Sequence, residues 1–181
     1  QVVRRQRQMC IRDSYYSLLV YSSLLGGGMS SRLFQEIREK RGLVYGISSF
    51  SSFYTDTGVF GIYCGTGENQ IQELIPVLCD QLNESPNSIT EKEINRGKAQ
   101  LKASLMMGRE SAFRRCESAA RQLLVFNRII DPAETIQNID KVSKETVQKI
   151  ANEIVKGPIT ISSIGPLSCL LYTSPSPRDS R

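Results

Sequence analysis

Residues 26–45 read GGGMSSRLFQEIREKRGLVY, and this stretch decides how the rest of the chain is interpreted. Three glycines come first, followed by Ser30 and Ser31, either of which can cap the N-terminus of a helix. Apolar residues then recur at helical spacing, which predicts a short amphipathic helix up to Gly42; they are Leu33, Phe34 and Ile37. On its polar face, Glu36 is expected to pair with both Arg32 and Lys40, because each lies four residues away.

The pattern changes on both sides of this helix. Upstream, residues 15–25 form an apolar run that predicts a helix ended by the glycines. Downstream, β-forming residues predict a hairpin with strands near 44–55 and 58–65, joined by the turn TDTG. Further helices are predicted at 68–82, 92–127 with a break near Gly108, 131–142 and 143–155; a loop is predicted at SPNS (85–88) and a closing strand at 159–165. This order predicts an α+β fold: a two-layer sandwich of an antiparallel or mixed sheet with helices packed on one face.

The two ends of the chain differ from its body. The net charge is +5, of which residues 1–14 carry +3 and residues 169–181 carry +1, so residues 15–168 are nearly neutral. RRQRQMCIRDS and CLLYTSPSPRD resemble translated transposon-adaptor sequence; the alternative is a disordered basic arm and a disordered Ser/Pro-rich tail. We therefore expect one domain at 15–168, between an adaptor-derived or disordered head (1–14) and tail (169–181). The charge gives no reason to expect nucleic-acid binding, and no run is apolar enough for a membrane span.

The residue types exclude several kinds of chemistry. The chain has no histidine, so it can build neither an H-x-x-E-H zinc site nor a Ser-His-Asp or Cys-His triad. GGGMSS matches no nucleotide-binding motif, and a simple connector between two helices is a competing interpretation. The paired carboxylates Glu91 and Glu93 are typical of a solvated helix start, because Thr90 and Glu93 form a capping box. No metal site is expected in this chain.

Several strings together point to one family: LGGGMSSRLFQEIREKRGLVY (25–45), the hairpin, GTG (65–67), ITEKEINRGKAQLKA (89–103) and RQLL (121–124). They resemble the C-terminal homologous domain of the pitrilysin, insulinase and mitochondrial processing peptidase family of zinc metallopeptidases, and the bacterial processing-peptidase-like members most. In that family two halves of similar fold enclose a chamber, and the first half carries the H-x-x-E-H zinc motif. The resemblance covers roughly residues 15–168 and implies a fragment that lacks the zinc-binding half and is inactive alone.

The resemblance also implies roles for particular residues. Arg38 and Tyr45 have the spacing of an arginine and a tyrosine that reach the zinc site and contact the bound peptide. An arginine offers fixed donors to a peptide carbonyl or carboxylate, and a tyrosine hydroxyl can donate to an oxyanion. The structural alternatives are a helix C-terminal cation for Arg38 and a core aromatic for Tyr45. Gly26, Gly27, Gly28 and Met29 match a longer glycine-rich loop that guides substrates, which implies substrate binding here.

The implied partners are an N-terminal zinc-binding half or homologous subunit, a peptide or protein substrate and, as one option, a second copy in a homodimer. Zinc is expected in the missing half or partner. The alternative function is a non-catalytic scaffold subunit of the same fold. The protein is expected to be soluble, in the bacterial cytoplasm or periplasm, and the compartment stays open. Because the chamber face is expected to be covered, we also expect exposed apolar surface and self-association.

Overall fold

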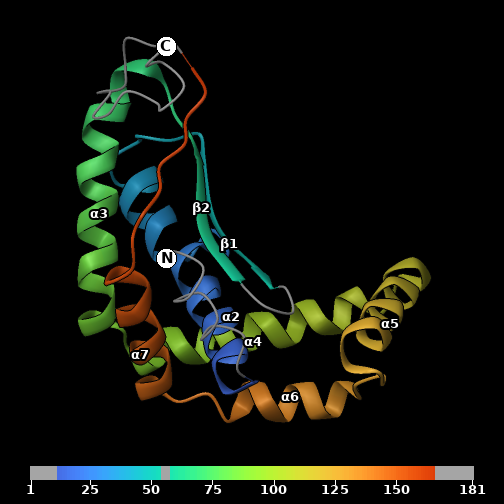
Figure 1. Ribbon diagram of the computed structural model, residues 1–181. Coiled ribbons are helices and arrows are strands. Elements are labelled where there is room, and N and C mark those ends of the chain that lie inside the picture. The colour runs from blue at the N-terminus through green and yellow to red at the C-terminus, as the bar shows by residue number, and fades with distance from the viewer. Residues whose placement is uncertain (1–11, 54–57, 166–181) are drawn as a thin grey trace, which may run out of the picture.

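The computed structural model describes residues 12–53 and 58–165, which form a helix-rich α+β arrangement around one antiparallel hairpin (Figure 1). The sandwich layering expected from the sequence is not confirmed in this part of the chain, where the sheet has only two strands. In chain order the elements are α2 (Arg12–Gly26), the π-helix η2 (Phe34–Glu39), β1 (Gly46–Phe53), β2 (Gly58–Gly65), the 3₁₀ turn η3 (Glu68–Gln70), α3 (Ile71–Ser88), α4 (Glu91–Gly108), α5 (Ala112–Phe126), α6 (Pro132–Asp140) and α7 (Lys144–Val155).

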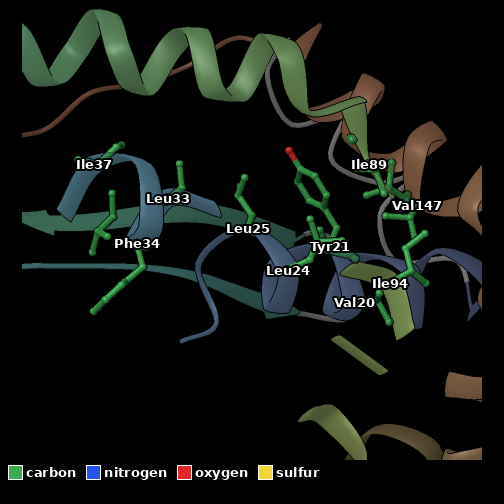
Figure 2. Packing of buried hydrophobic residues seen from close by; sticks show 14 of the residues in the cluster. Val20, Tyr21, Leu24, Leu25, Leu33, Phe34, Ile37, Ile89, Ile94 and Val147 are labelled. Atoms are coloured by element: carbon green, nitrogen blue, oxygen red, sulfur yellow. The ribbon is translucent and has the colours of Figure 1, made fainter. Parts of the chain in front are cut away.

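The core is built around α2. Its second half is apolar on almost every side, and Val20, Tyr21 and Leu25 have no exposed surface. The hairpin, α4 and α7 all pack on this helix, and Figure 2 shows its side chains meeting those of η2, α4 and α7. Each large aliphatic residue buried in this way stabilises the fold by about 1.5–3 kcal/mol. The Tyr21 hydroxyl lies 2.8 Å from the Ser85 hydroxyl of α3, so this buried polar group also has a hydrogen-bond partner.

The hairpin follows the predicted strands closely. β1 and β2 pair antiparallel, from Gly46 opposite Gly65 to Phe53 opposite Gly58, and most of the predicted connecting turn lies outside the described residues. Alternation of side chains places Ile47 of β1 and Ile62 of β2 against the core. The opposite face carries Phe50 and Tyr63, which are about half or more exposed.

The helix boundaries confirm most of the sequence predictions. Thr90 and Glu93 form the predicted capping box at the start of α4, and the predicted break separates α4 from α5 after Gly108. Asp131 and Ser143 cap α6 and α7 with their side chains. Local capping chemistry therefore determined where these helices begin, as expected for residues that satisfy otherwise unpaired N–H groups.

Two local predictions were wrong. Residues 159–165 do not form a strand, since they are exposed and pair with no described strand; a strand needs a neighbour for its N–H and C=O groups, which β-forming residues alone do not supply. SPNS is not a loop, because α3 continues through Ser88. There Ser85 and Pro86 are buried, and the Pro86 carbonyl accepts a hydrogen bond from Gln148 of α7 at 2.9 Å. Tertiary contact thus outweighs the local preference of proline for a turn.

Two further sequence expectations concern membrane spans and domain boundaries. Among the described residues, Cys64, Cys79 and Cys116 carry free thiols. Across residues 12–53 and 58–165 no helix is both long and apolar enough to cross a membrane. The domain boundaries at 14/15 and 168/169 remain predictions, and most of the predicted head and all of the predicted tail lie outside the described residues.

The close approach of α2 to the hairpin yields a stability prediction. A Cβ added to Gly26 would lie 2.4 Å from the backbone nitrogen of Ser49, a distance that the packed strand cannot relieve by a side-chain rotation. Gly26→Ala should therefore lower the free energy of unfolding by about 1–3 kcal/mol, measured by urea denaturation. Gly46→Ala is the matched control, because nothing lies within 4 Å of its added Cβ. Equal stability of the two variants would contradict this packing.

Candidate functional site

The candidate site begins at the corner where η2 turns into the hairpin. The helix is wider than an α-helix here, with the Lys40 N–H donating to the Gln35 carbonyl at 3.0 Å, five residues back. Gly42 then adopts a left-handed conformation (φ 64°), and its N–H donates to the Arg38 carbonyl. Glycine adopts this conformation without steric cost, which explains its position. π-helical turns are rare and occur frequently at functional sites, and no pattern in the sequence predicted this one.

Arg38 and Tyr45 lie at the two ends of this corner, and both side chains are exposed. Tyr45 is 81% exposed, so it is not the core aromatic of the structural alternative. Its backbone N–H donates to the Gly65 carbonyl at 2.7 Å, which fixes the residue beside the start of the sheet. The Arg38 guanidinium carbon lies 4.6 Å from the centre of the Phe34 ring, a cation–π contact within the helix. Their common segment is anchored in the core through Leu43 and Val44, which are nearly fully buried.

The glycine loop before η2 is held in place by side chains. The Gly27 carbonyl accepts a hydrogen bond from Gln100 of α4, and the Gly28 carbonyl accepts one from the Ser31 hydroxyl at 2.6 Å. Gln35 donates to the Met29 carbonyl at 2.7 Å, while the Met29 side chain is 75% exposed. The loop is therefore a closely bonded turn that presents one apolar side chain, rather than a loose connector.

A partly buried ion pair fixes the start of η2 to the start of α4. The Nε and Nη2 atoms of Arg32 donate to the two carboxylate oxygens of Glu93 at 2.5 and 2.7 Å, and Nη1 donates to the Ser88 hydroxyl. Each charged side chain is only about 15% exposed. The sequence predicted Arg32 to pair with Glu36 and Glu93 to be a solvated helix start. Both predictions were wrong, because the spacing along one helix cannot show what a second helix brings alongside. The predicted Glu36–Lys40 pair is present.

The same contacts control the ionisation of Glu93. Partial burial alone would raise the pKa of this carboxyl, but the hydrogen bonds from Arg32 and Thr90 outweigh it. They lower the pKa from the ordinary 4.5 to about 2. Glu93 is therefore charged throughout the physiological range, and its charge is part of the fold.

Two hollows flank this helix. The larger, of about 480 Å³, is polar and has charged side chains of both signs; it is lined by Ser30, Ser31, Arg32, Gln35, Glu36, Gln81, Glu84, Glu93 and Arg96. The smaller, of about 70 Å³, lies at the corner itself and is lined by Gly42, Leu43, Val44, Tyr45, Gly67 and Gln70. Tyr45 thus lines a small cleft beside the start of the hairpin.

The residues of this chain do not fit a zinc ion. No group of three or more Cys, Asp or Glu side chains in residues 12–53 and 58–165 is placed to hold a metal, and the sequence has no histidine. The exposed Arg38 and Tyr45 are hydrogen-bond donors, which suit a peptide oxygen rather than a cation.

A comparison with protein families decides the assignment of this fold. Residues 12–101 match the family described as "Peptidase M16 inactive domain". The chain belongs to the peptidase M16 family. This confirms the family resemblance found in the sequence.

Relatives and solved structures agree with this peptidase M16 assignment. An "uncharacterized zinc protease YmxG" of Bacillus subtilis is 36% identical over 155 residues, which cover 85% of this chain and 38% of the relative. The chain thus spans little more than a third of that relative's length. A peptidase M16 inactive domain from Pseudomonas fluorescens aligns with a TM-score of 0.67 and 24% identity, over 80% of this chain and 34% of that one. A Complex III chain of Candida albicans has the same TM-score at 21% identity, over 77% and 36%. The last two show the fold alone.

The Arg32–Glu93 pair yields a pH-dependent stability prediction. Because the folded pKa of Glu93 lies below its unfolded value, its stabilising contribution is present above about pH 4.5 and is lost as the pH falls towards about 2. Glu93→Gln should lower the free energy of unfolding at pH 7 by about 1–3 kcal/mol and flatten its decline between these pH values. Urea denaturation from pH 2 to 7 measures both effects. Exposed Glu153→Gln is the control; an unchanged pH profile in Glu93→Gln would contradict the assignment.

Proposed function

We propose that this domain is the substrate-binding, chamber-forming half of a zinc metallopeptidase that cleaves peptides, and that Arg38 and Tyr45 contact the bound substrate. The observation that carries the proposal is that both side chains are exposed at the ends of one turn whose backbone is anchored in the core. This exposure rules out a core role for Tyr45 and leaves the Arg38 guanidinium accessible to a ligand. The M16 inactive domain supports the family context, in which catalysis resides elsewhere.

The two side chains suit different oxygens of a peptide. Arg38 offers several N–H donors in a planar group, and the Phe34 ring beneath it limits its rotation. It would bind a carbonyl or a carboxylate of the substrate. Tyr45 has a free hydroxyl at the edge of the small cleft, where it would donate to the oxygen of the reacting carbonyl. In this proposal Arg38 orients the substrate and Tyr45 stabilises negative charge that develops on it.

The loop of Gly26, Gly27, Gly28 and Met29 would form the next part of the binding surface. Its carbonyl groups are occupied by side chains of the same domain, so the exposed Met29 is what it offers to a substrate. An unbranched thioether packs against apolar side chains of varied shape, which suits a site that accepts many sequences. The zinc would be held by an N-terminal half or a homologous subunit.

A second candidate function is a non-catalytic scaffold subunit. The Complex III chain has the same fold, and the residues described here hold no metal cluster. Retention of Arg38 and Tyr45 as exposed donors favours the peptidase, because a scaffold needs no paired donors at a turn. The two functions differ in what substitution of these residues does to peptide hydrolysis.

Transfer of this domain into an intact relative tests the proposal. In a chimera, residues 15–165 would replace the matching segment of the Bacillus subtilis zinc protease. Tyr45→Phe and Arg38→Ala should each lower kcat/KM for an unstructured peptide by about 10- to 100-fold. Arg38→Ala should also raise KM, because Arg38 is proposed to bind the substrate. Tyr63→Phe and Arg41→Ala are matched controls, since both side chains are exposed on neighbouring elements. Full activity in both test variants would favour the scaffold.

The chain by itself should be inactive. The purified 181-residue protein with added zinc is expected to release no product from a fluorogenic peptide above the rate of a buffer blank. The reason is chemical: it has no histidine, and its described residues form no metal cluster to activate water. Chelator-sensitive hydrolysis by the pure chain would contradict the proposal that the zinc is held by another half or subunit.

A further inference from the structure

We propose that α5 is a dimerisation surface on which a second copy of this chain packs antiparallel, crossing near Ala119. The helix lies at the far end of α4, away from the core around α2 (Figure 1). It is a defined helix nonetheless, because the Ser111 side chain caps its start and Asn127 ends it in a left-handed conformation (φ 53°). The inference does not depend on the proposed peptidase function.

One face of α5 is apolar and uncovered. Phe113 is 77% exposed and Leu124 is 88% exposed, while Leu123 is about half exposed. Together with Cys116 and Ala120, which are also exposed, they recur at intervals of three and four residues along one side of the helix. Such a stripe on an ordinary surface helix faces a core; here it faces solvent, which is unfavourable unless another surface covers it.

The apolar residues of α5 are arranged so that two copies of the helix can pack antiparallel through this stripe. With the crossing near Ala119, Phe113 of one copy faces Leu124 of the other, and Cys116 faces Leu123. The small side chains of Ala119 and Ala120 then lie at the crossing, where they allow the two helices to approach closely. Each contact occurs twice, as in a two-fold symmetric interface.

The charges beside the stripe select the same orientation. Glu117 and Arg121 lie along one edge of the apolar face and form an ion pair of 3.6 Å within the helix. In the antiparallel pair Glu117 of one copy comes level with Arg121 of the other, so both charges gain a second opposite partner. In a parallel pair this edge of one helix would face the other edge of its partner, so Glu117 and Arg121 would gain no opposite charge from each other. This self-complementarity is what identifies a second copy as the occupant.

An anionic membrane is the alternative occupant of a helix with arginines on its polar face. Arg114 and Arg115 would favour it, but Glu117 borders the apolar stripe and would enter the headgroup region with it. The sequence of contacts along α5 therefore favours protein over lipid. Vesicle binding is included in the experiment as an outcome that would overturn the proposal.

Sedimentation equilibrium of the full 181-residue chain between low and high micromolar concentration tests the dimer. We expect a monomer–dimer equilibrium that Leu124→Asp weakens about tenfold or more, since aspartate would be buried against Phe113 of the other copy. Glu117→Arg and Arg121→Glu alone should each weaken it several-fold, by about 3–10 times, and the double variant should restore it to within about twofold. Circular dichroism and thermal melting confirm that each variant is folded; α5 is so exposed that no loss is expected.

Matched controls change the same chemistry elsewhere. Glu153→Arg reverses an exposed charge on α7, and Ile161→Asp removes an apolar side chain that is 64% exposed; neither should alter the equilibrium. A strictly monomeric chain, or a dimer unaffected by Leu124→Asp, would overturn the proposal. Failure of the double charge variant to restore association would overturn the antiparallel arrangement. Binding of the monomer to phosphatidylglycerol vesicles that Leu124→Asp abolishes would assign the face to a membrane instead.

Discussion

Burial of the second half of α2, residues 20–26, on all sides is the constraint on which the rest of the structure depends. The hairpin, α4 and α7 each pack on one side of this helix. A shift of any one of them therefore displaces α2 and, through α2, the other two. A glycine makes the approach of the hairpin close enough. A Cβ on Gly26 would lie 2.4 Å from the backbone nitrogen of Ser49 of β1. Interiors packed at this density relax little, so the helix determines where each neighbour lies.

The candidate site takes its shape from this core and from one partly buried ion pair. Arg32 and Glu93 join η2 to α4 with two short hydrogen bonds between nearly buried groups. Leu43 and Val44 anchor the other end of the turn. Arg38 lies between these fixed points and Tyr45 directly follows them, and both side chains are left exposed, which is the arrangement expected of residues that bind something outside the domain.

Much of the candidate site could be predicted from the sequence, because its signals are local. These signals are capping residues, glycines that end helices and the period of the hydrophobic residues, all of which depend on neighbours within a few positions. They predicted α2, α4, α6, α7 and the hairpin. Arg38 and Tyr45 came from a family motif, and their roles remain a proposal. The π-helix, the Arg32–Glu93 pair and the hydrogen bonds that hold the glycine loop were missed. These features depend on contacts between groups that are far apart in the sequence or on how those groups pack. Residue spacing along the chain therefore does not predict them.

The sequence by itself determined the family, the absence of histidine chemistry and the type of most elements, since these follow from residue identity and short-range periodicity. Only the tertiary structure decided which charges pair, which apolar faces are covered and which predicted strand lacks a neighbour. Residues 159–165 and α5 illustrate the difference. Both have the pattern of buried elements, yet both are exposed, because burial requires a second surface and no described part of this chain provides one.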